Sequence, residues 1–246
     1  MNKKLTIFSL LVFAIAGSLL AQTRPEHVAI GDIYCSNGDI VTPDTYGSRT
    51  DGIGVVFYVD ETMQRGWIMY YKQGEACSWS LIESFQYPET SVVNSNRIAW
   101  DWYTDPETNT AVTNGIVKDT MGWHNTYADD VVSSNQYPAF SYAREPYEGC
   151  EHNWYLPACG QLNFMFAYLP VLNTSLREIG GDLIFQNNEE GYWSSNEYTP
   201  NSGQKYNQAW FLCGKRDNNK CFPGGFYPSL KSRNLPVRAV RNFDLN

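Results

Sequence analysis

Beyond its first 21 residues the chain has no long apolar run of the kind that spans a membrane. A transmembrane helix needs about 20 consecutive apolar residues, so none is expected in the remainder. A shorter apolar run, Leu5–Leu20, follows Lys3 and Lys4 and ends before Ala21, which is the pattern of a signal peptide. We predict cleavage after Ala21. Because no cysteine follows directly, lipid attachment there is excluded, and the mature chain is expected in the periplasm, on the cell surface or in the medium.

Basic residues are few and scattered. The chain has 18 Lys and Arg against 26 Asp and Glu, a net charge of −8. Loss of Lys3 and Lys4 with the signal peptide raises the acidic excess from eight to ten. A phosphate backbone is bound by clustered basic side chains, so nucleic acid is not an expected partner.

Histidine is scarcer still, and His27, His124 and His152 are the only three. None is spaced as a helical metal pair. Cys150 and Cys159 lie near His152, but exported thiols are more often oxidised or buried than bound to metal, so no metal site is predicted. The chain also lacks a Gly-x-Ser-x-Gly elbow, a glycine-rich phosphate loop and a His-Glu-x-x-His motif. We therefore predict a protein that is not an enzyme.

Six cysteines follow the signal peptide, an even number that permits disulfides in an exported chain. The best candidate pair is Cys213 with Cys221, because the polar, turn-rich residues 214–220 can bring two strand ends together. Closing so short a loop adds roughly 2 to 3 kcal/mol to stability in the chain-entropy model. The other four can pair in three ways, and some can be free buried thiols, so their connectivity stays open: Cys35, Cys77, Cys150 and Cys159.

Short β-branched and aromatic runs, separated by Gly, Asn and Pro clusters, predict brief strands throughout the chain. After a lead-in at residues 22–30, a single domain is expected over residues 31–246. Its expected strands include two near-continuous apolar runs, which favour burial on both faces. The last strand would place the end of the chain inside a sheet. The predicted strands are Ile30–Tyr34, Gly52–Val59, Gly66–Tyr71, Tyr192–Ser195, Ala209–Leu212 and Val237–Arg241.

Two helical regions are expected among these strands, which gives an α+β class. The first begins near Asn125 or Thr126 and continues or restarts after Pro138. The second begins at Pro157, carries apolar residues at helical spacing, is broken or kinked at Pro170, and ends at Gly180.

Several blocks resemble one family in their order along the chain. They are Trp154–Leu162, Gly191–Tyr198, Ala209–Leu212 and Val237–Arg241, preceded by Gly31–Tyr34 and Gly54–Val59. Together they resemble the Lcl C-terminal-like domain family, exported bacterial modules of largely unknown function. The resemblance implies a C-type-lectin-like fold of short antiparallel strands, two helices and long loops, and a binding or surface role.

In C-type-lectin-like folds the long loops meet the ligand, which makes loop residues of the C-terminal part the candidate ligand-binding residues. Tyrosines flanked by polar groups suit this role because they give large contact area at low entropy cost. Trp193 and Trp210 are expected in the core instead. The candidates are Glu197, Tyr198, Tyr206, Arg216, Asp217 and Tyr227.

No cofactor is expected, although calcium is kept as an alternative. The Glu-Pro-Asn and Trp-Asn-Asp motifs of calcium-dependent lectins are absent, but residues 196–201 supply hard oxygen ligands.

The leading hypothesis is an exported, non-catalytic module that binds a glycan, a host or matrix polymer, or a partner protein. One alternative is an oxidase of the formylglycine-generating type that uses Cys213 and Cys221 as its cysteine pair. Another is a structural subunit of a surface appendage.

Overall fold

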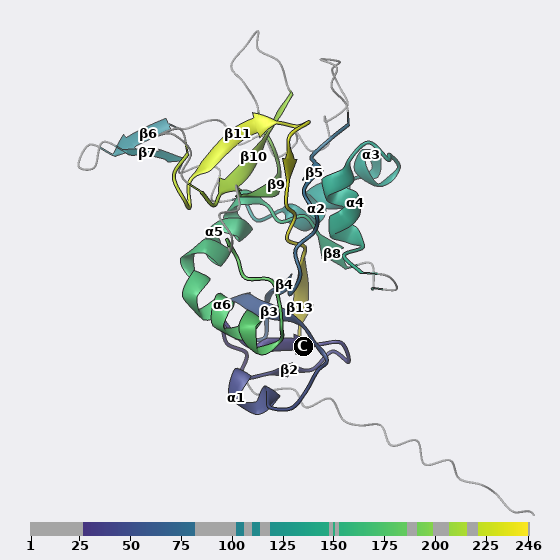
Figure 1. The fold of residues 1–246 in the computed structure, drawn as a ribbon, viewed down its shortest axis with the longest axis vertical. Helices are drawn as coiled ribbons and strands as arrows, with labels where there is room; N and C mark the ends of the chain where they lie inside the picture. The colour runs from purple at the N-terminus through teal and green to yellow at the C-terminus, as the bar shows by residue number, and fades with distance from the viewer. Residues whose placement is uncertain are drawn as a thin grey trace, which may run out of the picture.

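The computed structural model describes residues 27–81, 119–147, 150, 153–185, 191–198, 207–215 and 221–245, and the backbone of residues 102–105 and 110–113. The expected signal peptide and most of the lead-in lie outside these residues. The described elements form antiparallel sheets flanked by short helices (Figure 1), which confirms the α+β class. No helix within these ranges is long and apolar enough to cross a bilayer.

A six-stranded antiparallel sheet occupies the half of the molecule that carries both ends of the described chain. Its strand order is β2-β1-β3-β4-β13-β8. β13 lies between β4 and β8, so the chain does end inside a sheet, although this strand begins three residues later than predicted. The strands are β1 (Ile33–Cys35), β2 (Ile40–Val41), β3 (Gly52–Val59), β4 (Arg65–Tyr70), β8 (Trp154–Tyr155) and β13 (Val240–Asp244).

A second, three-stranded antiparallel sheet lies at the opposite end of the molecule from β2 (Figure 1). It has the order β11-β10-β9, with β9 (Gly191–Glu197), β10 (Gln208–Cys213) and β11 (Phe226–Leu230). Two-stranded ribbons pair β5 (Cys77–Ser78) with β12 (Asn234–Leu235), and β6 (Trp102–Asp105) with β7 (Thr110–Thr113).

The expectation of two helices is wrong, because the described residues contain six helical segments. The predicted start of the first helix near Asn125 or Thr126 is wrong, because a segment already begins at Gly122 and ends at Thr126. Ala128 is extended, and further segments begin at Asp129 and at Pro138. The second begins at Cys159 and not at Pro157, and it is divided at Tyr168, while Pro170, the predicted break, lies in the first turn of the following segment. The segments are α1 (Pro43–Tyr46), α2 (Gly122–Thr126), α3 (Asp129–Val132), α4 (Pro138–Arg144), α5 (Cys159–Ala167) and α6 (Leu169–Glu178).

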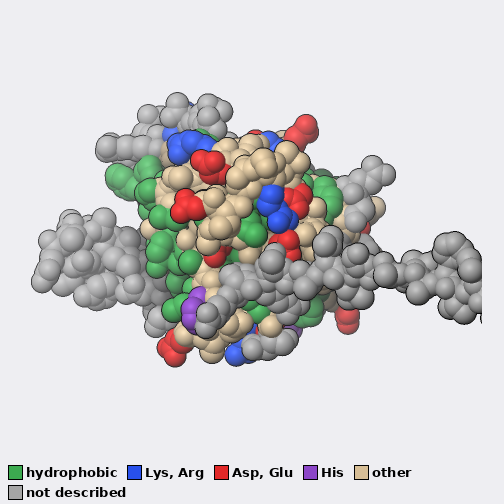
Figure 2. All heavy atoms as spheres, turned by 90° about the horizontal axis from the view of Figure 1, so that it is seen from below, with side chains coloured by type: hydrophobic (Ala, Val, Ile, Leu, Met, Phe, Trp, Pro, Cys, Tyr) green, Lys and Arg blue, Asp and Glu red, His purple; other side chains and the backbone are tan. Residues whose placement is uncertain are grey.

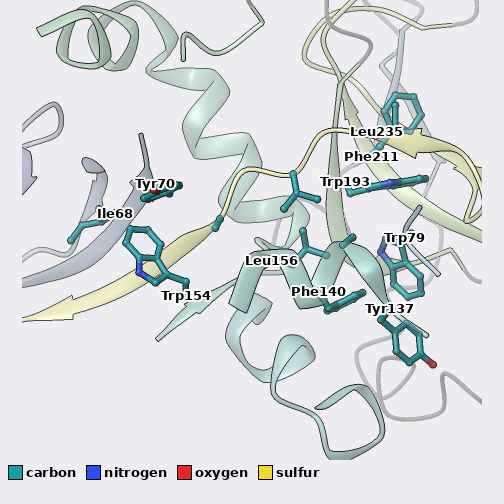
Figure 3. Close-up of a cluster of buried hydrophobic side chains, with 14 of the residues drawn as sticks. Ile68, Tyr70, Trp79, Tyr137, Phe140, Trp154, Leu156, Trp193, Phe211 and Leu235 are labelled. Atoms are coloured by element: carbon teal, nitrogen blue, oxygen red, sulfur yellow. The ribbon is translucent and has the colours of Figure 1, made fainter. Parts of the chain in front are cut away.

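The two larger sheets share a core that is rich in aromatic side chains. Figure 3 shows Tyr70 and Trp154 of the six-stranded sheet in the same cluster as Trp193 and Phe211 of the three-stranded sheet. Trp193 is fully buried and Trp210 is 5% exposed, which confirms that both belong to the core. A second apolar cluster packs α5 and α6 against β3 and β4. β3 and β4 are therefore buried on both faces, as their apolar runs predict.

Arg238 is a buried cation that links the sheets. Its guanidinium donates to the carbonyl oxygens of Tyr70 at 3.2 Å, Tyr71 at 3.0 Å and Asp182 at 2.9 Å, and to the hydroxyl of Tyr192 at 3.5 Å. Among the described residues no carboxylate forms an ion pair with it. Backbone carbonyls thus satisfy most of this charge, and the side chain joins the end of β4 to β9.

The surface around α1 carries mixed charge. Figure 2 views the molecule from this end and shows acidic and basic side chains interspersed. Arg49 illustrates the pattern, since its guanidinium contacts Asp39 at 3.1 Å and Asp51 at 2.8 Å. Because positive and negative side chains lie so close together, their electrostatic potentials largely cancel and this surface has no strong charge of one sign.

Candidate functional site

The candidate ligand-binding residues belong to the three-stranded sheet and its connections. β10 pairs antiparallel with both neighbours, so that Ala209 lies opposite Glu197 of β9 and Phe211 lies opposite Tyr227 of β11. Tyr206, Arg216 and Asp217 lie outside the described residues. The other three candidates can be placed, and they differ in their surroundings.

Cys213 and Cys221 form a disulfide, as predicted. Their Cα atoms are 6.3 Å apart, within the usual range for the bond. The bridge joins the end of β10 to the segment that leads into β11. Cys213 is fully buried and Cys221 is 8% exposed, so the sulfurs lie in the core and not in an open cleft.

Glu197 is not the exposed loop residue that the sequence predicts. It is the last residue of β9, and its side chain is only 1% exposed. Its carboxylate binds the ammonium of Lys231, which lies 4.8 Å from the centre of the Trp79 ring. Both partners are buried, which makes this pair part of the internal packing of the sheet.

Asn196, next to Glu197, is also committed to internal contacts. Its side-chain oxygen accepts the backbone N–H of Cys159 at 2.8 Å, and its amide donates to Asp119. Asn196 and Glu197 are the first two residues of the segment considered for calcium. Their side-chain oxygens accept from protein donors in this structure and are therefore engaged elsewhere. Thr199, Pro200 and Asn201 lie outside the described residues. Within the described ranges, no group of three acidic, histidine or cysteine side chains is arranged for a metal ion.

The serines of β9 extend this buried polar network. The hydroxyl of Ser194 donates to the carbonyl of Trp210 at 2.9 Å, and the carbonyl of Ser194 accepts the indole N–H of Trp79 at 2.8 Å. Ser195 accepts the amide of Asn125 at 3.0 Å. These hydrogen bonds connect β9 to α2, to the start of α5 and to Trp79. They therefore fix the position of the three-stranded sheet.

Tyr198 and Tyr227 retain partly exposed side chains. The ring of Tyr198 packs edge-on against Trp210 at 5.3 Å, while the Tyr227 ring lies 6.4 Å from Phe211. The Tyr227 hydroxyl accepts the backbone N–H of Phe222 at 3.1 Å. Each tyrosine is therefore oriented by the sheet and presents part of its surface to solvent, although Tyr227 lies within β11 and not in a connection as the sequence predicts.

The four remaining cysteines are free thiols in this structure. Burial raises the pKa of Cys77 to about 11 and that of Cys159 well above its usual value, and the pKa of Cys35 rises to about 11 through burial and the nearby charge of Asp51. Because the thiolate is the reactive form, these three side chains are held in their unreactive state.

Sequence reasoning missed Lys231 and Asp119, the partners that draw Glu197 and Asn196 inward. Lys231 lies 34 residues from Glu197 and Asp119 lies 77 residues from Asn196. No local pattern in the sequence marks such distant pairs.

Comparison with known proteins shows a likeness to a solved structure but to no family or curated sequence. No protein-family model matches the chain, and no curated protein matches it. The chain is similar to a fimbrial protein from Bacteroides ovatus, with a TM-score of 0.57 and 17% sequence identity. The likeness covers 88% of this chain and 49% of that one, so this chain spans about half the length of its structural neighbour. At this identity the likeness shows a shared fold alone.

Proposed function

We propose that this chain is an exported, non-catalytic surface module that binds its ligand through the connections of the three-stranded sheet. The observation that carries the proposal is the sheet itself: its strands are fixed by the buried Glu197–Lys231 pair and the Cys213–Cys221 bridge. Such a scaffold can present irregular connections without losing its own geometry. The resemblance to Lcl C-terminal-like domains supports a C-type-lectin-like arrangement and the use of these connections for binding.

Tyr198 and Tyr227 are the described residues best suited to contact the ligand. Both rings are braced by core aromatics and partly exposed, which lowers the entropy lost when they are immobilised on binding. Tyr206, Arg216 and Asp217 belong to the same connections and complete the proposed contact set. Glu197 is left out, since its carboxylate is engaged inside the sheet.

The oxidase alternative is less well supported by the sulfur chemistry. An enzyme that cycles a cysteine pair needs sulfurs that substrate can reach, whereas Cys213 and Cys221 are bonded and buried. A structural bridge accounts for this placement. Copper-dependent thiol oxidation by the wild type that is lost in Cys213→Ser would reverse this choice.

A structural subunit of a surface appendage is the second candidate function, and the fold of the fimbrial protein favours it. A subunit of this kind would assemble with copies of itself or with other subunits. Light scattering of the purified mature chain over a range of concentrations separates the two functions. A free binder stays monomeric, whereas an appendage subunit forms larger species as concentration rises.

The test of the proposed function is binding of the mature chain to arrays of glycans, matrix polymers and host proteins. We expect saturable binding to one of these, with a loss of at least tenfold in affinity in the Tyr198→Ala and Tyr227→Ala variants. Tyr168→Ala, which removes an exposed tyrosine of similar size beside α6, is the matched control and should bind as the wild type does. A monomer that binds nothing across all three arrays would overturn the proposal.

A further inference from the structure

A row of three side chains crosses the six-stranded sheet far along the chain from the connections of the three-stranded sheet. Tyr58 of β3 lies directly opposite Trp67 of β4, and Trp67 lies directly opposite Asn242 of β13. Directly opposed residues share one face of a sheet, so these three side chains stand side by side. Tyr58 and Trp67 are partly exposed and Asn242 is exposed.

The aromatic part of the row is rigid. The rings of Tyr58 and Trp67 stack with their centres 4.2 Å apart, and Phe164 of α5 braces them at 4.9 and 5.8 Å. Phe57 also lies 5.9 Å from the Trp67 ring, so the indole is held from the β3 side, while its register partner on the other side is Asn242 of β13. Among the described residues the indole N–H of Trp67 has no hydrogen-bond partner.

A chain of hydrogen bonds fixes which atoms Asn242 presents. The backbone N–H of Ala158 donates to the oxygen of Gln161 at 3.0 Å, so the Gln161 amide nitrogen must donate to the Tyr155 hydroxyl, 2.8 Å away. That hydroxyl then donates to the oxygen of Asn242 at 2.6 Å. Burial raises the pKa of Tyr155, so the hydroxyl keeps its proton over the whole physiological range.

The end of this relay is an oriented surface donor. With its oxygen occupied by Tyr155, Asn242 has only its amide N–H groups left to offer, and no described residue accepts from them. A relay anchored on a buried backbone N–H also polarises the bonds along it, which strengthens the terminal donor. Fixed donors beside a fixed aromatic face require little ordering when a ligand binds.

We propose that Tyr58, Trp67 and Asn242 form a subsite for a neutral glycan. A pyranose ring has an apolar C–H face that packs on an indole and hydroxyl groups that accept from an amide, the two features that this row offers side by side. The row carries no charge, and its nearest charged neighbours are of opposite sign, since Asp244 of β13 lies directly opposite Arg65 of β4. A row without a basic side chain offers no counter-charge for sulfate or uronate groups, which leaves neutral sugars as the ligand class. The inference goes beyond the proposed function, because it adds a second contact surface on the six-stranded sheet and names the class of ligand that this surface takes.

Asn242→Asp is the decisive variant, because its carboxylate still accepts from Tyr155 but cannot donate to a sugar hydroxyl. We expect the wild type to bind at least one of a panel of neutral hexasaccharides of glucose, galactose, mannose or xylose in saturation-transfer NMR. Asn242→Asp and Trp67→Ala should each raise Kd at least tenfold. Trp67→Phe, which keeps a ring but loses the N–H, should lie between wild type and Trp67→Ala.

Matched controls come from the same residue types elsewhere on the surface. Asn234→Asp and Trp123→Ala alter exposed residues outside the row and should keep the wild-type Kd. Melting curves confirm that each variant is folded. An unchanged Kd in folded Asn242→Asp would overturn the subsite, and if Tyr198→Ala then abolished binding the proposed function would still stand. Failure of the wild type to bind any neutral hexasaccharide would also overturn the subsite, while binding to matrix or protein arrays would leave the broader function intact.

Discussion

At the scale of single residues, the pair of Glu197 and Lys231 shows how a polar side chain near a loop can serve the interior. Its side-chain exposures of 1% and 6% mean that neither charge is solvated by water. Removing one partner of such a pair leaves a buried charge uncompensated, which typically costs about 3 to 5 kcal/mol.

Lys231→Met should therefore lower the free energy of unfolding by about 3 to 5 kcal/mol, measured by urea denaturation. The matched control is Lys72→Met, because Lys72 and Asp182 are 40% and 42% exposed and such a pair contributes at most about 1 kcal/mol. The double variant Lys231→Met with Glu197→Gln should recover part of the loss. A stability of Lys231→Met equal to that of the control would contradict the assigned role.

Asp32 gives a residue-scale prediction that depends on pH. Burial raises its pKa, and the hydrogen bond from the backbone N–H of Ala29 only partly opposes this. An acid whose folded pKa is raised destabilises the native state once pH rises above the unfolded pKa, because its charged form is penalised by folding. The cost is absent below the unfolded pKa.

Asp32→Asn should accordingly raise the melting temperature at pH 7, and the gain should shrink to nothing as pH falls below the ordinary carboxyl pKa of about 3.9. Melting curves of both proteins between pH 3 and pH 8 make the comparison. If Asp32→Asn raised the melting temperature equally at all pH values, removal of the buried negative charge would not be the cause.

At the scale of elements, the Cys213–Cys221 bridge links the end of β10 to the segment that leads into β11. Reduction, or replacement of both cysteines by serine, should lower the free energy of unfolding by roughly 2 to 3 kcal/mol in the chain-entropy model. Urea denaturation with and without dithiothreitol measures this in the wild type. The serine variant should show no further loss on reduction, and an equal response of both proteins would place the sensitive disulfide elsewhere.

The strands that the sequence predicts best are bounded by sharp local signals. β3 coincides with the predicted run Gly52–Val59, and β10 extends the predicted run by one residue at each end. β11 could not be predicted because Pro228 interrupts it. A proline removes a ladder donor and is tolerated at a sheet edge, and β11 is an edge strand.

The helices and the candidate site were harder to predict for a related reason. Segments as short as α2 and α3 carry too little periodic pattern to be counted separately, and their ends are set by tertiary contacts. The hydroxyl of Thr126 at the end of α2, for example, accepts the backbone N–H of Leu156. Burial of Glu197 likewise depends on Lys231, which lies far away in the sequence and comes close only in the folded chain.

At the scale of the whole molecule, Arg238 couples the two larger sheets. It is fully buried and bonds to carbonyls at the end of β4 and to the side chain of β9. Arg238→Met would remove the guanidinium donors to the carbonyl oxygens of Tyr70 and Asp182, at about 1 to 3 kcal/mol for each, whereas the Tyr71 carbonyl keeps the backbone N–H of Asp182.

We expect Arg238→Met to lower the free energy of unfolding by at least about 2 kcal/mol. Arg177→Met, on the exposed face of α6, should change stability by no more than about 0.5 kcal/mol. Guanidinium denaturation followed by tryptophan fluorescence and by far-ultraviolet circular dichroism tests the coupling. Similar stability in both variants would mean that the sheets are held together without this side chain.

The central claim is that this molecule binds a surface ligand and does not transform it. The most direct measurement is titration of the mature chain with the ligand found on the arrays, followed by mass spectrometry of the recovered ligand. The account predicts saturable binding and a ligand of unchanged mass. A recovered ligand with altered mass, lost when Cys213 is replaced by serine, would contradict it.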